Sequence, residues 1–111
     1  AMMINDVCRW IHDHLEQPLR QSQAAEIVGM NASTFSRFFK QATSRTFTAY
    51  VNDLRTGRAS RLLIETDLPI TSIAYRCGFA DPAYFHRVFK RVKNIGPSAY
   101  RMQYRDGRDK P

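Results

Sequence analysis

The sequence predicts an all-α fold of about seven helices, which form two helix-turn-helix subdomains joined by a long central linker helix. Three observations carry this prediction. Apolar residues recur at helical spacing, a stretch of the chain is repeated about 50 residues further on, and glycine and proline stand where helices would end or begin. At 111 residues the chain can bury one modest core or two very small ones.

The repeat pairs residues 31–50 with residues 81–100. The identical pairs are Phe35/Phe85, Arg37/Arg87, Phe39/Phe89, Lys40/Lys90, Ala49/Ala99 and Tyr50/Tyr100. Upstream the shift is 49, because Ala25 then matches Ala74 and Gly29 matches Gly78. The turn of the second copy is therefore expected to be one residue longer than that of the first.

Each copy is expected to form a short helix, a turn with glycine, and a longer helix. The short helices are predicted over about 21–29 and 70–77, and Gly29 and Gly78, which can take a positive φ, are expected to end them. Asn31 and Asp81 suit the position before a helix because their side-chain oxygens accept backbone amide hydrogens. Pro82 suits the first helical position.

The longer helices carry apolar residues at i, i+3, i+4 and i+7, which predicts one buried stripe on each. The stripes are Phe35, Phe38, Phe39 and Ala42 in the first copy and Phe85, Val88, Phe89 and Val92 in the second. These phenylalanines are expected in the core, and Tyr50 and Tyr100 are expected to pack with their hydroxyls at the surface.

The rest of the chain divides around one long helical pattern. We expect a first subdomain over 1–46, a linker helix over 47–66, a second subdomain over 67–104 and a basic, flexible tail over 105–111. Proline ends the linker helix because it has no amide to donate. Apolar residues at helical spacing between Ile4 and Leu15 predict an opening helix packed on the first subdomain.

The charge of the chain points to a polyanionic partner. Seventeen Lys and Arg against ten Asp and Glu give a formal net charge of +7, which favours nucleic acid and leaves an anionic membrane surface open. The end of the chain is the most basic part, with eight basic and two acidic side chains over residues 87–111.

Cysteine usage and the absence of a signal peptide or a long apolar run predict a cytoplasmic protein. Cys8 and Cys77 lie within apolar patterns and have no CxxC spacing, so we expect free, buried thiols. The start at Ala1, Met2 and Met3 suggests an excised piece of a longer protein.

The outward faces of the longer helices are the candidate DNA-reading surfaces, since the second helix of such a unit fits a major groove. They comprise Ser33, Ser36, Arg37 and Lys40 in one copy and Ala83, His86, Arg87 and Lys90 in the other, with Tyr84 beside them. The arginines could contact guanine or a phosphate, and the lysines are better placed to contact phosphates. A basic helix face is usually only solvated, but its recurrence in both copies favours DNA contact. His86 is a base contact or merely a surface residue.

Catalysis, cofactors and metals find no support in the motifs. Cys8, His12, His14, Cys77 and His86 match no zinc spacing, and there is no GxSxG, glycine-rich phosphate loop or HExxH. We therefore expect neither an enzyme nor a metal or cofactor site.

Four segments, AAEIVGMNASTFSRFFK, RTGRASRLL, ITSIAYRCGFADPAYFHRVFK and GPSAYR, resemble the C-terminal DNA-binding domain of AraC/XylS transcriptional regulators. The resemblance runs from about residue 5 to residue 101. It implies two recognition helices about one turn of DNA apart and a separate effector-sensing or dimerising domain. It also implies double-stranded promoter DNA and RNA polymerase as partners.

The resemblance carries particular positions onto the two recognition helices. These are Ala32, Ser33, Ser36 and Arg37 in the first helix and Pro82, Ala83, Tyr84, His86 and Arg87 in the second. The chain departs from the family where glycine commonly ends both helices, because Ser44 and Asn94 stand there. Serine tolerates the left-handed conformation less well than asparagine, so the first helix is expected to end differently.

Two rival functions compete with DNA binding. A protein-interaction module could dock its basic face on an acidic partner, and would then hold little DNA at moderate salt. An RNA or membrane-surface binder is disfavoured, because the A-form major groove does not admit a helix and the apolar stripes are committed to the core.

Overall fold

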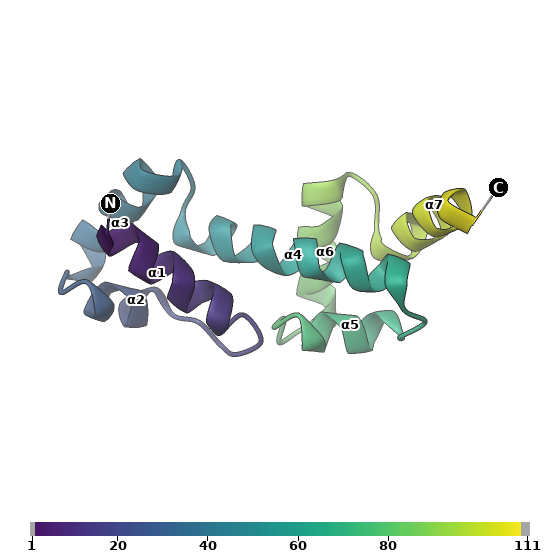
Figure 1. Cartoon of the computed structure of the whole chain (residues 1–111), viewed down its shortest axis with the longest axis horizontal. Helices are drawn as coiled ribbons and strands as arrows, with labels where there is room; N and C mark the ends of the chain where they lie inside the picture. Colours follow the sequence, from purple (N-terminus) through teal and green to yellow (C-terminus); the bar gives the residue numbers. More distant parts are fainter. Residues whose placement is uncertain (1, 110–111) are drawn as a thin grey trace. The chain divides into compact units, whose positions relative to one another are not determined.

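The computed structural model describes residues 2–109, and for residue 2 and residues 106–109 it describes the backbone alone. This part of the chain forms seven helices and no strand (Figure 1), which confirms the predicted fold class. The helices are α1 (Met2–Asp13), α2 (Gln21–Ile27), α3 (Ala32–Thr43), α4 (Phe47–Glu65), α5 (Ile70–Arg76), α6 (Pro82–Lys93) and α7 (Pro97–Asp109).

The chain divides into two compact units between Leu54 and Arg55, inside α4. Unit 1 is residues 1–54 and unit 2 is residues 55–111. The first part of α4 therefore belongs to unit 1 with α1, α2 and α3, and the remainder belongs to unit 2 with α5, α6 and α7.

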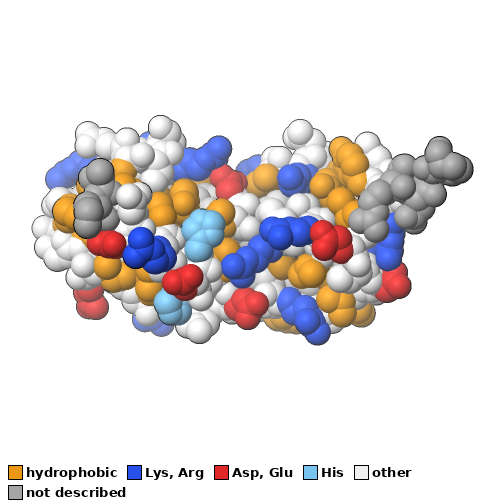
Figure 2. Space-filling view, in the orientation of Figure 1, with side chains coloured by type: hydrophobic (Ala, Val, Ile, Leu, Met, Phe, Trp, Pro, Cys, Tyr) orange, Lys and Arg blue, Asp and Glu red, His pale blue; other side chains and the backbone are white. Residues whose placement is uncertain are grey.

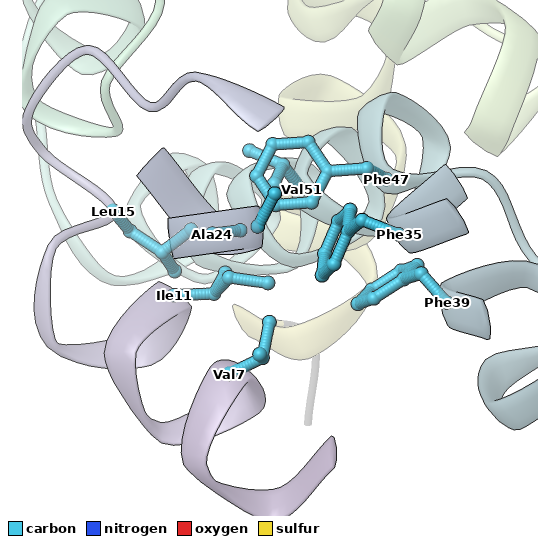
Figure 3. Packing of buried hydrophobic residues seen from close by; sticks show 9 residues of the cluster. Val7, Ile11, Leu15, Ala24, Phe35, Phe39, Phe47 and Val51 are labelled. Atoms are coloured by element: carbon cyan, nitrogen blue, oxygen red, sulfur yellow. The ribbon is translucent and has the colours of Figure 1, made fainter. Parts of the chain in front are cut away.

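The core of unit 1 is an aromatic cluster surrounded by aliphatic side chains (Figure 3). Phe35 and Phe39 of α3 are fully buried, and Phe47 at the start of α4 meets both rings edge-on at centroid distances of 6.1 and 5.7 Å. The aliphatic part comes from α1, the loop after it, α2 and α4: Val7, Ile11, Leu15, Ala24, Ala25 and Val51.

The core of unit 2 repeats this arrangement around Phe85 and Phe89 of α6, both fully buried. Phe79, in the turn before α6, packs on Phe85 at a centroid distance of 5.0 Å. The remaining buried residues come from α4, α5, the residue that ends α5, and α6: Ala59, Leu63, Ile73, Ala74, Cys77 and Val88. Each unit thus buries a hydrophobic core of its own.

The predicted apolar stripes are one position too long in both recognition helices. Ala42 and Val92 are exposed, and Phe38 is only partly buried. Ala42 and Val92 lie in the last turn of their helices, beyond the buried phenylalanines, so their side chains meet solvent instead of the core.

The helix starts and the glycine turns follow the sequence prediction. Asn31 Oδ1 accepts a hydrogen bond from the Thr34 amide at 2.8 Å, and Asp81 Oδ1 accepts one from the Ala83 amide at 3.0 Å. The glycines after α2 and α5 have φ of 68° and 98°. Both turns therefore use the conformation that only glycine adopts at little cost.

The prediction that the first recognition helix ends differently from the second is wrong. Ser44 and Asn94 have φ of 65° and 71°, both left-handed, and each amide donates to a carbonyl four residues earlier at 2.8 Å. The backbone hydrogen bond and the turn that follows hold serine in the conformation that asparagine adopts more readily.

The last helix, α7, continues past the predicted end of the second subdomain. The predicted tail is helical over residues 105–109, and residues 110 and 111 lie outside the described part of the chain. The flexibility of this end stays a prediction.

Candidate nucleic-acid interface

The predicted reading face of α3 lies in solvent. Ala32, Ser33, Ser36, Arg37 and Lys40 are all exposed, while Phe35 and Phe39 on the other side of the helix are buried. The face follows from the 3.6-residue period of a helix whose apolar side is fixed in the core. It carries two cations and is otherwise small and polar.

The corresponding face of α6 is larger and more basic. Ala83, Tyr84, His86, Arg87 and Lys90 are exposed, and Pro82, at the first helical position, is half-buried. Arg91 and Lys93 add two cations in the last turn of the helix, where positive charge also stabilises the helix dipole. The structure thus brings each set of predicted residues together on one exposed helix face.

On the α6 face, the side chains of Tyr84 and Arg87 contact one another. The Arg87 guanidinium carbon lies 5.7 Å from the centroid of the Tyr84 ring, within the range of a cation–π interaction. The Tyr84 ring in turn lies 6.2 Å from the ring of Phe79. A continuous contact therefore connects the core of unit 2 to the head of Arg87.

Arg55 is another basic group of unit 2, and its surroundings shift its pKa. Arg55, in the unit 2 part of α4, is half-buried, and burial lowers the pKa of its guanidinium. The negative charge of ionised Tyr84 or Cys77 would act in the opposite direction and raise that pKa. Because burial is the largest of these causes, the pKa of Arg55 stays below its ordinary value.

The net charge of the chain belongs to unit 2. Residues 1–54 contain five basic and five acidic side chains, whereas residues 55–111 contain twelve basic and five acidic ones, a net charge of +7. Figure 2 shows Lys and Arg side chains in a row along α4, which itself carries three arginines, all in its unit 2 part. The attraction of a polyanion is correspondingly stronger for unit 2.

Two arginines of the basic C-terminal end have structural partners that the sequence did not reveal. Arg101 Nε donates to the Leu63 carbonyl at 2.9 Å, and its second guanidinium nitrogen donates to the Thr66 carbonyl at 3.1 Å. These carbonyls lie at the end of α4, where a helix lacks partners of its own. Arg105 pairs with Asp67 nearby. The only signal in the sequence was the position of Arg101 in the GPSAYR segment.

Other chemistry is sparse in the described part of the chain. It contains no group of three or more His, Cys, Asp or Glu that could hold a metal ion, and none of its helices is long and apolar enough to cross a membrane. Neither cysteine forms a disulfide, as predicted, and Cys77 is buried, whereas Cys8 is only half-buried.

The sequence matches known proteins over most of its length. The model of a family described as a helix-turn-helix domain matches residues 24–103, which include both recognition helices. The chain belongs to this helix-turn-helix family, in its AraC type. The resemblance found in the sequence motifs is thereby confirmed.

Curated relatives of this AraC-type domain are transcription regulators by name. The chain is 35% identical over 106 residues to the HTH-type transcriptional activator RhaS of Enterobacter sp. (strain 638). It is 31% identical over 102 residues to the uncharacterised HTH-type regulator YpdC of Escherichia coli. These matches cover 96% and 92% of this chain but only 37% and 36% of the relatives.

Solved structures of similar fold include one with DNA. The DNA-binding domain of AdpA, in complex with a target DNA, matches with a TM-score of 0.90 and 30% identity over 97% of both chains. The C-terminal domain of the response regulator yesN from Fusobacterium nucleatum matches with a TM-score of 0.83 and 28% identity, over 87% of this chain and 95% of that one.

Proposed function

We propose that this domain binds double-stranded promoter DNA in a sequence-specific way, with α3 and α6 in successive major grooves. The observation that carries the proposal is the repetition of one exposed polar and basic helix face in both helix-turn-helix units. The AdpA domain, which shares the fold over almost its whole length, binds its target DNA. We further propose that the whole protein is a bacterial regulator of transcription initiation.

Each recognition helix has a set of side chains suited to base or backbone contact. Arg37 and Arg87 have the length and planar head to bind a guanine edge, and Lys40 and Lys90, one turn further on, are suited to phosphates. The smaller contacts would come from Ala32, Ser33 and Ser36 on α3, and from Pro82, Ala83, Tyr84 and His86 on α6.

The partners of the full regulator are also proposals. The matched segments are only 37% and 36% of the relatives named above, so an effector-sensing domain that also mediates dimerisation fits the remaining length. RNA polymerase would be the protein partner at the promoter, and the cytoplasm the compartment. We assign the domain no catalytic activity, cofactor or metal.

Selection of binding sites from a randomised duplex pool tests the proposal directly. The 111-residue chain is used as it stands, and the affinity for the enriched duplex is followed against salt. Enrichment of one site with two preferred patches about ten base pairs apart is the expected result. No enrichment, together with loss of binding at moderate salt, would overturn sequence-specific recognition and turn attention to an acidic protein partner.

The roles of the two cations on α6 can be separated on the selected duplex. Arg87→Ala should lose about 1–3 kcal/mol of binding on that duplex and relax one base position. Lys90→Ala, as the matched control, should weaken binding to selected and random DNA alike. It should also make the binding affinity depend less steeply on salt concentration. Equal losses for Arg87→Ala on selected and random DNA would refute its role as a base reader.

A further inference from the structure

We propose that Tyr84 is a positioning residue, whose ring holds the Arg87 guanidinium in place before DNA arrives and so sharpens the base preference of α6. This inference rests on the proposed function, since it concerns how the DNA-reading face is prepared. It assigns the aromatic side chain of that face a task in addition to any contact that it makes with DNA itself.

The Tyr84 ring is supported by Phe79. Phe79 is 2% exposed and packs on the buried ring of Phe85. The Tyr84 ring lies against Phe79 at 6.2 Å, although Tyr84 itself is 37% exposed. One side of the tyrosine is thus anchored to the core of unit 2, while the rest is available to a neighbour.

The neighbour of the Tyr84 ring on the α6 face is Arg87. Arg87 is three residues further along α6, so the two side chains lie on the same side of the helix. The guanidinium carbon is 5.7 Å from the ring centroid. An exposed arginine otherwise samples many rotamers and loses that freedom when it binds. A ring that already restricts the guanidinium lowers this entropic cost.

Helix α3 offers the contrast to α6. Arg37 occupies the matching place in the first copy, but the residue three positions before it is Thr34, which has no ring. The backbone amide of Thr34 is engaged by the Asn31 cap. The position three residues before the arginine thus holds an aromatic ring in unit 2 and a small side chain in unit 1, which makes Arg37 a natural internal control.

The expected size of the effect is modest and measurable. A cation–π contact at an exposed site corresponds to about a two- to fivefold change in an equilibrium constant. Tyr84→Leu keeps an apolar side chain on Phe79 but removes the ring, and Tyr84→Phe keeps the ring and removes the hydroxyl. We expect the leucine variant to lose about two- to fivefold of its preference at the base position that Arg87→Ala relaxes. The phenylalanine variant should retain that preference.

A double-mutant cycle on the selected duplex separates positioning from an independent contact. If Tyr84 acts through Arg87, Tyr84→Leu should have no further effect on base preference once Arg87 is alanine. Losses that multiply in the Tyr84→Leu/Arg87→Ala variant would overturn the proposal. So would a loss for Tyr84→Phe as large as that for Tyr84→Leu, because the hydroxyl and not the ring would then be responsible.

A measurement without DNA keeps this test distinct from that of the proposed function. Nuclear magnetic relaxation of the arginine Nε–Hε groups in the free domain should show Arg87 more ordered than Arg37. Tyr84→Leu should reduce the order of Arg87 and leave that of Arg37 unchanged. Equal order of the two arginines in the unmodified domain would overturn the inference. A domain that selects no duplex would overturn the proposed function, and the relaxation data would still decide whether the ring orders Arg87.

Discussion

Phe35 and Phe85 are equivalent residues of the two units, and both are fully buried. The residues just before them differ, because unit 1 has Thr34 and unit 2 has Tyr84. Net charge follows the same division, with none in unit 1 and +7 in unit 2. A repeated helical plan therefore carries two different surfaces, and the comparison indicates that unit 2 supplies most of the electrostatic attraction to DNA.

The largest expected effects test the shared part of the comparison. Phe35→Ala and Phe85→Ala should each lower the free energy of unfolding by about 3–5 kcal/mol, because each removes a fully buried ring from an aromatic core. Urea unfolding of the two variants beside the unmodified domain measures both losses. A loss below about 1 kcal/mol for one variant would show that the core of that unit depends less on its phenylalanine than the core of the other unit does.

Sequence reasoning found these cores because their signal is periodic and local. The phenylalanines of α3 and α6 recur at helical spacing, and the capping residues Asn31 and Asp81 act on amides two or three residues away. The extent of the stripe was overestimated at Ala42 and Val92, because periodicity says which side of a helix a residue lies on but not how far the core extends along it.

The contacts that escaped prediction join residues far apart in the sequence. Arg101 contacts carbonyls 35 and 38 residues earlier, and composition alone placed it among the cations of a basic end. The side-chain hydrogen bond between Tyr50 and Cys8 likewise joins residues 42 positions apart in the sequence. For the reading faces, the sequence indicated which residues share a side of the helix. It did not predict the contact between Tyr84 and Arg87, which depends on how the two side chains are oriented.

The second prediction concerns a contact that unit 2 has and unit 1 lacks at the repeat position. Arg101 corresponds to Val51 when the chain is shifted by 50. Arg101→Ala should lower the free energy of unfolding by about 1.5–3 kcal/mol, because two carbonyls at the end of α4 lose a charged donor. The control is Arg105→Ala, which breaks a pair whose Asp67 side chain is 92% exposed and should cost less than about 1 kcal/mol. Equal losses in calorimetry would deny Arg101 a special role.

The third prediction concerns the left-handed residues that end the two recognition helices. A left-handed conformation costs a residue with a Cβ roughly 1–2 kcal/mol, and asparagine less than most. Ser44→Gly should therefore stabilise the domain by roughly 1 kcal/mol, and Asn94→Gly by a smaller amount. Thermal unfolding of the two variants gives the comparison. A larger gain for Asn94→Gly would mean that unit 2, and not unit 1, carries the greater backbone strain at its helix end.

The smallest expected effect concerns Tyr50, one of the two equivalent tyrosines. Tyr50 packs edge-on against Phe39 with ring centroids 5.3 Å apart, and Tyr100 packs against Phe89 at the same distance. Burial first, and then a hydrogen bond to Cys8 and its charge, raise the pKa of Tyr50 from 10.0 to about 12. Because a hydrogen bond that raises the pKa of a phenol stabilises its protonated form, the Tyr50 hydroxyl acts as the donor.

A titration of phenolate absorbance in the ultraviolet tests the raised pKa of Tyr50. The signal that Tyr50→Phe removes should be centred near pH 12. Cys8→Ala should move it downward but leave it above 10.0, since burial is the largest cause of the shift. Because an unfolded tyrosine ionises near pH 10, the stability that Tyr50 contributes is fully present below that pH and is lost as the pH rises towards 12. A Tyr50 signal centred near pH 10 would show that neither burial nor Cys8 raises the pKa of this hydroxyl.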